Sequence, residues 1–336
     1  MITLEKIDDL FLRLHTFDSI LSKVASVSAV AQTRRIEAKL RQYFLAKWNV
    51  LRREAAEKAA RLARDGKSPE AIASAVRNIM DEWSSEVRRQ LTEDMARIYR
   101  LGRESLWVKA QRMGAQPVEK AAKKIVLSPV FDQADRQAIR AIQNQQLFWI
   151  SEVDGYQKEI ASKIRDVAES VILEGGGDRI FAGKELREEI DRVLGYISTP
   201  SGYNGSVESY FEGLAASAST TARTQGQIRS LQDLEVTSYV VVNPDDERTC
   251  PICSEMNGKS FTVEMAGEMA DDELSADTPD EVKEAHPFVD LADVKGLDSE
   301  ELASKGIIMP PFHFKCRCNV DIDSSSILQE SEEEEK

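Results

Sequence analysis

Four cysteines and one histidine near the C-terminal end of this 336-residue chain constrain its fold more than any other feature. Cys250 and Cys253 form a C-x-x-C pair, while Cys316 and Cys318 form a C-x-C pair that closely follows His313. Two close pairs separated by a long segment are typical of metal ligands, because thiolates from both ends of the segment can meet on one ion. The fold must then bring the two pairs together.

We interpret this cluster as a structural zinc site in which five donors compete for four tetrahedral positions. A disulfide pair, a redox-active C-x-x-C and ordinary buried thiols remain as alternatives. A disulfide is disfavoured because the N-terminus shows no secretory leader, which predicts a reducing compartment, and because C-x-C is too short to bridge easily. Redox activity is disfavoured because no thioredoxin-like βαβ pattern surrounds the motif.

The first two thirds of the chain has the periodicity of long amphipathic helices. Apolar residues recur at three- and four-residue spacings, which place them on one helix face. Few strand signals interrupt this pattern, so helical hairpins or a bundle are expected. The predicted helices cover residues 2–22, 29–64, 68–101, 103–113 and 132–173.

The pattern changes after residue 175. A last helix is predicted over 206–231, followed by strands rich in β-branched and aromatic residues over 235–242, 259–263 and 316–322. The expected fold is α+β and mostly α, with a long helical region before a small zinc-knuckle-like α+β module. The expected domains are a helical domain 1–175, a linker 176–205, a module 206–322 with an acidic insert 264–309, and a disordered acidic tail 323–336.

Charge is distributed unevenly along the chain. Residues 1–130 hold 25 Lys and Arg against 16 Asp and Glu, a net of +9, whereas the remainder holds 19 against 42, a net of −23. This asymmetry suggests two different contact surfaces, although solvated helix faces explain it as well. No run of about 18 apolar residues occurs, so no membrane contact is expected.

Other candidate chemistry is sparse. His15 is expected on a solvated helix face, and His286 in a loop of the acidic insert. The sequence lacks the phosphate-binding, dinucleotide-binding, nucleophile-elbow and zinc-protease motifs. We therefore predict no catalytic residues and no enzymatic activity.

The C-terminal half resembles the phage Mu F-like minor head proteins, also called phage head-morphogenesis proteins. The resemblance covers roughly residues 205–322, and its motifs occur in the family's order. Gln225 departs from the family, which usually has Glu there, and the insert is longer than expected. The motifs are Thr221-Ala222-Arg223-Thr224, Tyr239–Val242, the segment from Asp246 to Cys253, Asn257-Gly258-Lys259 and the segment from Pro310 to Cys318.

The resemblance implies a low-copy structural protein of the phage procapsid, bound at or near the portal vertex. Its partners would be the portal protein and other head proteins, and association with packaged DNA stays open. The protein would reside in the host bacterial cytoplasm before assembly and in the virion head afterwards. A metal-dependent nuclease or phage-encoded toxin that uses the Cys/His cluster is the alternative function.

Four polar residues are predicted to support the metal site. Asp246, Arg248 and Thr249 precede the first thiol, where their side chains can bond neighbouring backbone and fix the entry to the knuckle. Arg223, on the preceding helix, could bind a carboxylate such as Asp246 through two hydrogen bonds. A solvent-facing Arg223 is the alternative.

Overall fold

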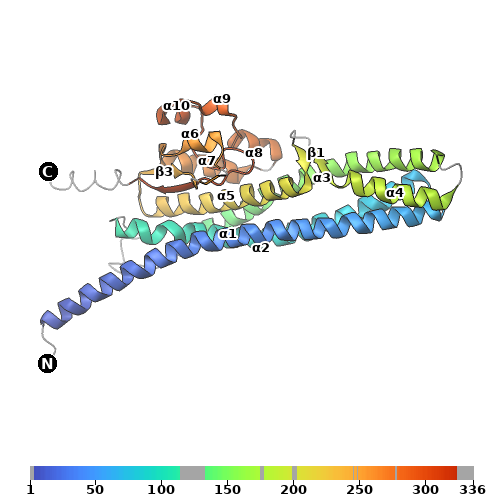
Figure 1. The fold of residues 1–336 in the computed structure, drawn as a ribbon. Coiled ribbons are helices and arrows are strands. Elements are labelled where there is room, and N and C mark those ends of the chain that lie inside the picture. The colour runs from blue at the N-terminus through green and yellow to red at the C-terminus, as the bar shows by residue number, and fades with distance from the viewer. Residues whose placement is uncertain are drawn as a thin grey trace. The chain divides into compact units, whose positions relative to one another are not determined.

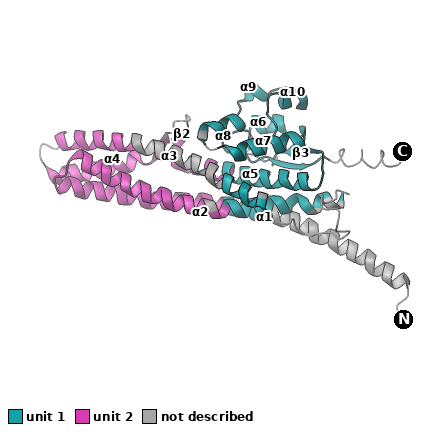
Figure 2. Ribbon diagram, turned by 180° about the vertical axis from the view of Figure 1, so that it is seen from behind, with its two compact units in different colours: residues 1–37, 95–142, 217–336 teal, residues 38–94, 143–216 magenta. Residues whose placement is uncertain are grey.

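The protein is described by a computed structural model that covers residues 4–113, 133–174, 178–198, 203–244, 246–247, 249–276 and 278–323. The chain forms two compact units (Figure 2). Unit 1 comprises residues 1–37, 95–142 and 217–336, and unit 2 comprises residues 38–94 and 143–216. Arg248 and almost all of the predicted tail 323–336 lie outside the described residues.

The predicted fold class is confirmed: the chain is mostly helical, with small antiparallel sheets in its C-terminal part (Figure 1). The long helices are α1 (Leu4–Arg64), α2 (Pro69–Arg112), α3 (Gln133–Glu174), α4 (Arg179–Val193) and α5 (Val207–Asp233). The short helices are α6 (Pro251–Met256), α7 (Val263–Ser275), α8 (Pro279–Ala285), α9 (Leu291–Val294) and α10 (Ser299–Ser304). The strands are β1 (Tyr196–Ser198), β2 (Asn204–Ser206), β3 (Ser238–Val242), β4 (Ser260–Thr262) and β5 (Asn319–Ile322).

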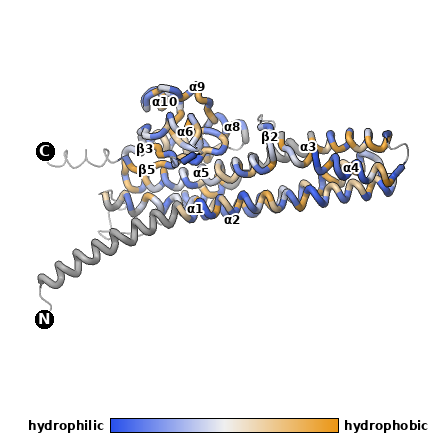
Figure 3. The backbone as a smooth tube through the Cα atoms, in the orientation of Figure 1, coloured by the Kyte–Doolittle hydropathy of each residue, from blue (hydrophilic) through white to orange (hydrophobic). Residues whose placement is uncertain are grey.

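Unit 2 is a helical assembly with an aromatic core. Hydrophobic and hydrophilic segments alternate along its helices, as their amphipathic sequence requires (Figure 3). Trp48 packs edge-on against Trp83 with ring centroids 4.9 Å apart, and Phe211 of α5 contacts both rings. The Trp48 indole donates a hydrogen bond to the Leu194 carbonyl at 2.8 Å, which satisfies its buried N–H.

The α1–α2 turn follows its sequence signals. Gly66 ends α1 with φ +73°, a left-handed conformation that glycine adopts without steric cost. Ser68 caps α2 by accepting a hydrogen bond from the Ala71 amide, and Pro69 occupies the first helical position.

Unit 1 contains the C-terminal module, whose three-stranded antiparallel sheet has the order β4-β3-β5. Alternation places Tyr239 and Val241 of β3 in the core together with Val320 and Ile322 of β5. Helices α6 to α10 lie around this sheet, and α5 runs along it (Figure 1). The strand that we predicted over 316–322 is shorter than expected, because its pairing with β3 begins only at Asn319.

Two glycines set the packing of α2 against α5 in unit 1. A Cβ at Gly102 would lie 2.3 Å from the Arg223 carbonyl oxygen, and a Cβ at Gly226 would lie 2.3 Å from the Tyr99 carbonyl oxygen. Either side chain would force the helices apart. Our prediction that one helix ends near residue 101 and another begins at 103 was therefore wrong, since Gly102 serves close packing inside a continuous α2.

The segment 176–205, which we expected to be a linker, contains α4 and most of a β-hairpin. Asp178 caps α4 by accepting hydrogen bonds from the Ile180 and Phe181 amides. Helix α4 buries Leu186 and Ile190 in the core of unit 2. The sequence did not predict α4 because its stripe of buried apolar residues is short. The glycine- and turn-rich segments on both sides of α4 also obscure its helical periodicity.

No helix in the described part of the chain is both long enough and apolar enough to span a membrane.

A buried ion-pair network joins α2, α3 and α5 within unit 1. The Arg103 guanidinium binds Asp135 at 3.0 Å and Asp233 at 2.7 Å, and the Arg103 and Asp135 side chains are 1% and 0% exposed. The Tyr99 hydroxyl donates to Asp135 at 2.9 Å. These contacts compensate the desolvation of both charges, so the network fixes the start of α3 to its neighbours.

We predict that Arg103→Met lowers the free energy of unfolding by about 3–5 kcal/mol, because it removes the cation that pairs with the buried Asp135 carboxylate. Urea denaturation of the full chain followed by circular dichroism would measure this loss. Arg192→Met is the matched control, since Arg192 pairs with Glu189 on an exposed face of α4. An equal loss in the two variants would contradict a special role for the buried network.

Candidate metal centre

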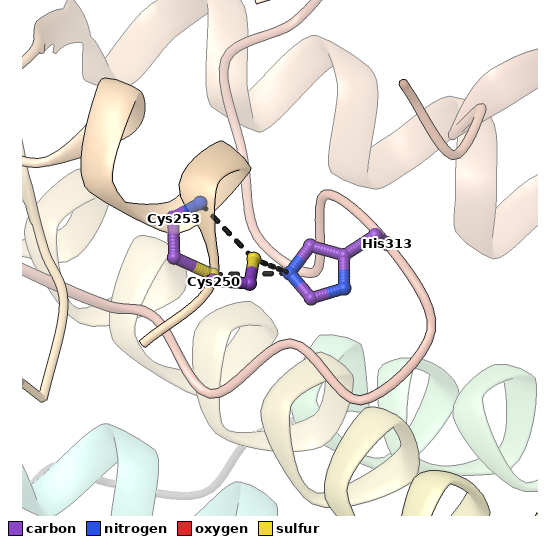
Figure 4. A group of neighbouring side chains, drawn as sticks. All are labelled: Cys250, Cys253 and His313. Carbon is purple, nitrogen blue, oxygen red and sulfur yellow. Dashed lines mark hydrogen bonds between the residues drawn. The ribbon is translucent and has the colours of Figure 1, made fainter. Parts of the chain in front are cut away.

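The first turn of α6 positions the C-x-x-C pair. Cys250 is the N-cap of α6 and its sulfur accepts a hydrogen bond from the Cys253 amide at 3.4 Å. Pro251 occupies the first helical turn, where the N–H that proline lacks would have no hydrogen-bond partner within the helix. This turn directs both sulfurs to the same side of α6 (Figure 4).

The second group of donors lies on the loop that leads into β5. His313 and Cys316 are joined by a turn in which the Cys316 amide donates to the His313 carbonyl at 3.0 Å. Lys315 inside this turn has φ +73°, a left-handed conformation that is rare for a residue with a side chain. His313 Nδ1 lies 2.7 Å from the Phe314 carbonyl, so this nitrogen is the donor and Nε2 is left to face the sulfurs.

All five predicted donors come together. His313 Nε2 lies 3.1 Å from Cys250 Sγ and 3.0 Å from Cys253 Sγ, and the Cys253 and Cys316 sulfurs are 3.9 Å apart. The donor atoms form two groups of three, each within 4.8 Å: Cys250, Cys253 and His313, and Cys253, Cys316 and Cys318. Cys253 belongs to both groups and is the centre of the cluster.

These distances and donor types fit a metal ion. Sulfurs around a tetrahedral zinc with bonds of about 2.3 Å lie about 3.8 Å apart, close to the separation of Cys253 and Cys316. The sulfur–nitrogen distances are about half an ångström shorter than in a zinc site, so a bound ion would move the imidazole slightly outward. The cluster could therefore hold a metal ion such as zinc.

The cluster is buried, and the pKa of each of these ligands depends on the charge and hydrogen bonds of its neighbours. Burial opposes a charged His313, but hydrogen bonds and negative charge from Cys253 and Cys316 raise its pKa to about 11. Burial likewise opposes ionisation of Cys316, yet hydrogen bonds from Cys253, Cys318 and His313 hold its pKa well below the usual value. Hydrogen bonding to Cys316 raises the pKa of Cys253, and hydrogen bonding to Cys253 and then to Cys316 raises the pKa of Cys318. Without a metal, the geometry therefore favours a Cys316 thiolate beside a protonated His313.

The main chain that carries these ligands is bound by a polar stripe on α5. Thr220 donates to the Cys316 carbonyl at 2.8 Å, Arg223 to the Cys318 carbonyl at 2.8 Å, and Gln227 to the Val320 carbonyl at 3.4 Å. At the start of the stripe, the Ser217 hydroxyl accepts from the Lys315 amide at 3.0 Å. Side chains three or four residues apart on α5 have about the same spacing as alternate carbonyl groups of an extended segment. The α5 side chains therefore form hydrogen bonds with main-chain groups that are not bonded to a neighbouring strand.

Arg223 lies in a different place from the one we predicted. It is buried and binds the Cys318 carbonyl, whereas Asp246 pairs with Arg317 through two hydrogen bonds of 2.6 and 2.7 Å. The predicted Arg223–Asp246 pair was wrong, and so was the solvent-facing alternative. Arg317, between the two ligands of the C-x-C pair, presents its guanidinium to Asp246 in the turn that precedes Cys250.

The turn before Cys250 contains two of the predicted supporting residues. Thr249 and Asp246 close it with two hydrogen bonds: the Thr249 amide donates to the Asp246 carbonyl at 2.8 Å, and the Asp246 amide donates to the Thr249 hydroxyl at 3.1 Å. Together with the Arg317 pair, these bonds hold the turn against the loop that carries Cys316. Arg248, the third predicted residue, lies outside the described residues.

His286 lies in the bend that follows α8, in the acidic insert as we expected, and its side chain is buried. Its Nδ1 lies 3.3 Å from Glu273 and its Nε2 lies 2.8 Å from the Met309 carbonyl. Gln225 of α5 donates to the same Glu273 oxygen at 2.6 Å. Burial opposes protonation of His286, but the Glu273 charge and these hydrogen bonds raise its pKa. The hydrogen bonds of Glu273 and His286 therefore join the acidic insert to α5 and to the segment that leads into His313.

Sequence reasoning missed several supporting residues, namely Ser217, Thr220, Gln227 and Arg317. The missed signal is a set of polar residues at three- and four-residue spacing in α5, a helix that is buried almost throughout this stretch. A buried helix with a periodic polar stripe predicts a hydrogen-bonded partner, because buried polar groups are rarely left unpaired.

All four cysteines are free thiols in this structure, so the cluster contains no disulfide. Comparison of the chain with protein-family models, with curated proteins and with solved structures found no match. What can be said of its function therefore depends on its own residues and their geometry.

We predict that the protein purified under reducing conditions carries about one zinc ion per chain, and that Cys253→Ser loses more of it than Cys250→Ser. Cys253 belongs to both donor groups and is 4% exposed, whereas Cys250 belongs to one and is half-buried. Elemental analysis and the thiolate absorption of the cobalt-substituted protein would measure this. Ser254→Ala, on an exposed position of α6, is the control. A folded, reduced protein without metal would contradict the assignment.

We also predict that metal affinity falls as the pH is lowered from about 8 to about 6. Metal ligands must be deprotonated, and His313, Cys253 and Cys318 all have raised pKa values without the ion, so loading releases protons. Lower pH therefore favours the metal-free form. Chelator competition at several pH values, with proton release followed by an indicator dye, tests this. Equal affinity across the range would refute the ligand assignment.

Proposed function

We propose that this chain is a structural protein of a tailed-phage head, in which a zinc-stabilised module acts in procapsid assembly at or near the portal vertex. One observation carries the proposal. Segments that carry the resemblance to the Mu F-like minor head proteins are far apart in the sequence and converge on one cluster. They are the helix segment with Arg223, the pair Cys250 and Cys253, and the loop from His313 to Cys318. Motifs that stabilise the same fold are expected to lie together in space, even when they are far apart in the sequence.

The burial of the ligands supports a structural role for the ion. Cys316 and Cys318 are 0% exposed and Cys253 is 4% exposed. A catalytic zinc keeps an open position for water, whereas a structural zinc is closed by four protein ligands. Five donors leave no vacancy in a tetrahedral shell, and thiolates that surround zinc reduce its Lewis acidity toward a bound water.

The module's exposed surface is acidic and suits a protein partner with a basic surface. The short helices of the insert present many carboxylates to solvent, among them Glu264, Glu268, Asp271, Asp272, Asp280, Glu284 and Glu300. Such a surface repels the phosphate backbone, so contact between this module and DNA is disfavoured. We infer that the module binds another head protein, and that any contact with packaged DNA involves the basic N-terminal residues.

We predict that the zinc-loaded chain binds the portal protein of the same phage, and that the double variant Glu268→Lys/Asp272→Lys weakens binding by roughly tenfold at low salt. Both side chains are exposed on α7, so the module should still fold. Pull-down and surface plasmon resonance at two salt concentrations would measure the effect. Glu188→Lys on α4, outside the module, is the control.

The same preparation should be assayed against DNA and RNA. Our proposal expects no cleavage by the zinc-loaded protein, and it expects portal binding to be lost when Cys253→Ser releases the metal. Metal-dependent cleavage that disappears in Cys316→Ser, together with no portal association, would support the nuclease or toxin alternative instead.

A further inference from the structure

Arg223 is a buried cation whose position the metal-free module does not explain. It is 8% exposed, and its guanidinium makes one hydrogen bond, to the Cys318 carbonyl at 2.8 Å. Its Nε has no hydrogen-bond partner, and within the described ranges no carboxylate lies at ion-pairing distance from it. Burying a charge without a partner is costly, so a nearby negative charge is expected in the functional state.

Arg103 provides the comparison within the same unit. It is also buried, but it binds two carboxylates, Asp135 and Asp233. Arg223 donates instead to the main chain of Cys318, and the side chains of Cys316 and Cys318 are among the groups whose negative charge favours its charged form. The carboxylate of Glu37 in α1 contributes the largest favourable charge to Arg223, and the positive charge of Arg34 opposes it.

The metal-loaded cluster would supply the missing negative charge. Metal ligands bind as thiolates, so three cysteines and a neutral histidine around a divalent ion leave one net negative charge, and four cysteines leave two. This charge is confined to a buried site, where the low dielectric strengthens its interaction with a nearby cation.

We propose that Arg223 is the counter-cation of the metal–thiolate centre: it raises the affinity of the cluster for a divalent metal through its charge, without ligating the ion. This inference rests on the proposed metal site and adds a residue to it. Arg223 is a positioning and charge-balancing residue, and the hydrogen bond to the Cys318 carbonyl holds it against the ligand strand.

Thr220 offers a matched control for the hydrogen bond alone. It lies one helical turn before Arg223 on α5, is buried, and donates to the Cys316 carbonyl at the same 2.8 Å. Thr220→Val removes a bond to the ligand strand without changing any charge. Arg223→Gln keeps a donor but removes the charge, and Arg223→Lys keeps both a donor and the charge.

The experiment measures the zinc dissociation constant of the full chain by chelator competition for the wild type and these three variants. We expect Arg223→Gln to weaken zinc binding by about 10- to 100-fold. Arg223→Lys should stay near the wild-type value, and Thr220→Val, which removes one bond to the main chain of Cys316, should weaken binding clearly less than Arg223→Gln does. In chelator, Arg223→Gln should lower the melting temperature less than it does with zinc bound, because the charge of the metal–thiolate centre is then absent.

Each outcome decides the inference. Equal weakening by Arg223→Gln and Thr220→Val would overturn it, as would an equal loss of melting temperature with and without zinc, because either result assigns Arg223 a purely structural hydrogen bond. If Arg223→Gln fails to fold, Arg223→Lys decides: wild-type affinity supports the role of charge, and a loss greater than that of Thr220→Val refutes it. A wild type that binds no zinc would refute the proposed metal site itself, which distinguishes the two failures.

Discussion

The hydrogen bonds between α5 and the segment that contains Cys316 and Cys318 and leads into β5 are the interaction on which the C-terminal module depends. β5 is an edge strand, so the carbonyl groups on its free side need partners other than a neighbouring strand. The Gln227 side chain of α5 supplies such a partner to Val320 of β5, and Thr220 and Arg223 bind the carbonyls of Cys316 and Cys318 just before the strand. The same bonds fix the main chain next to the metal ligands, so the fold of the module and the geometry of the cluster have one cause.

The position of α5 is itself determined by its packing against α2 within unit 1. Gly102 and Gly226 allow the two helices to approach so closely that a side chain at either position would overlap the other helix's backbone. The buried Arg103 binds Asp233 near the end of α5 and Asp135 of α3, which adds an ionic constraint to the same contact. Close packing and buried ion pairs resist small displacements, so the polar stripe of α5 stays aligned with its strand.

The acidic insert is an ordered part of the module. Its helices are short and begin with side-chain caps, as at Thr278 and Asp298, which compensates for the few backbone hydrogen bonds inside them. The buried contact of Glu273 with His286 and Gln225 anchors the insert to α5. The segment has an acidic exterior over an apolar interior, and its short helices are joined by loops.

The sequence by itself determined the mostly helical fold class, the three strands of the module and the five donors of the cluster. These features have local signals: apolar periodicity, β-branched runs, and cysteines at ligand spacing. The tertiary structure alone decided that Gly102 lies inside a helix, that Arg223 is buried against the Cys318 carbonyl, and that Arg317 pairs with Asp246. The physical reason is that each of these depends on a partner distant in the sequence, and a local pattern contains no information about which distant group a polar or small residue will meet.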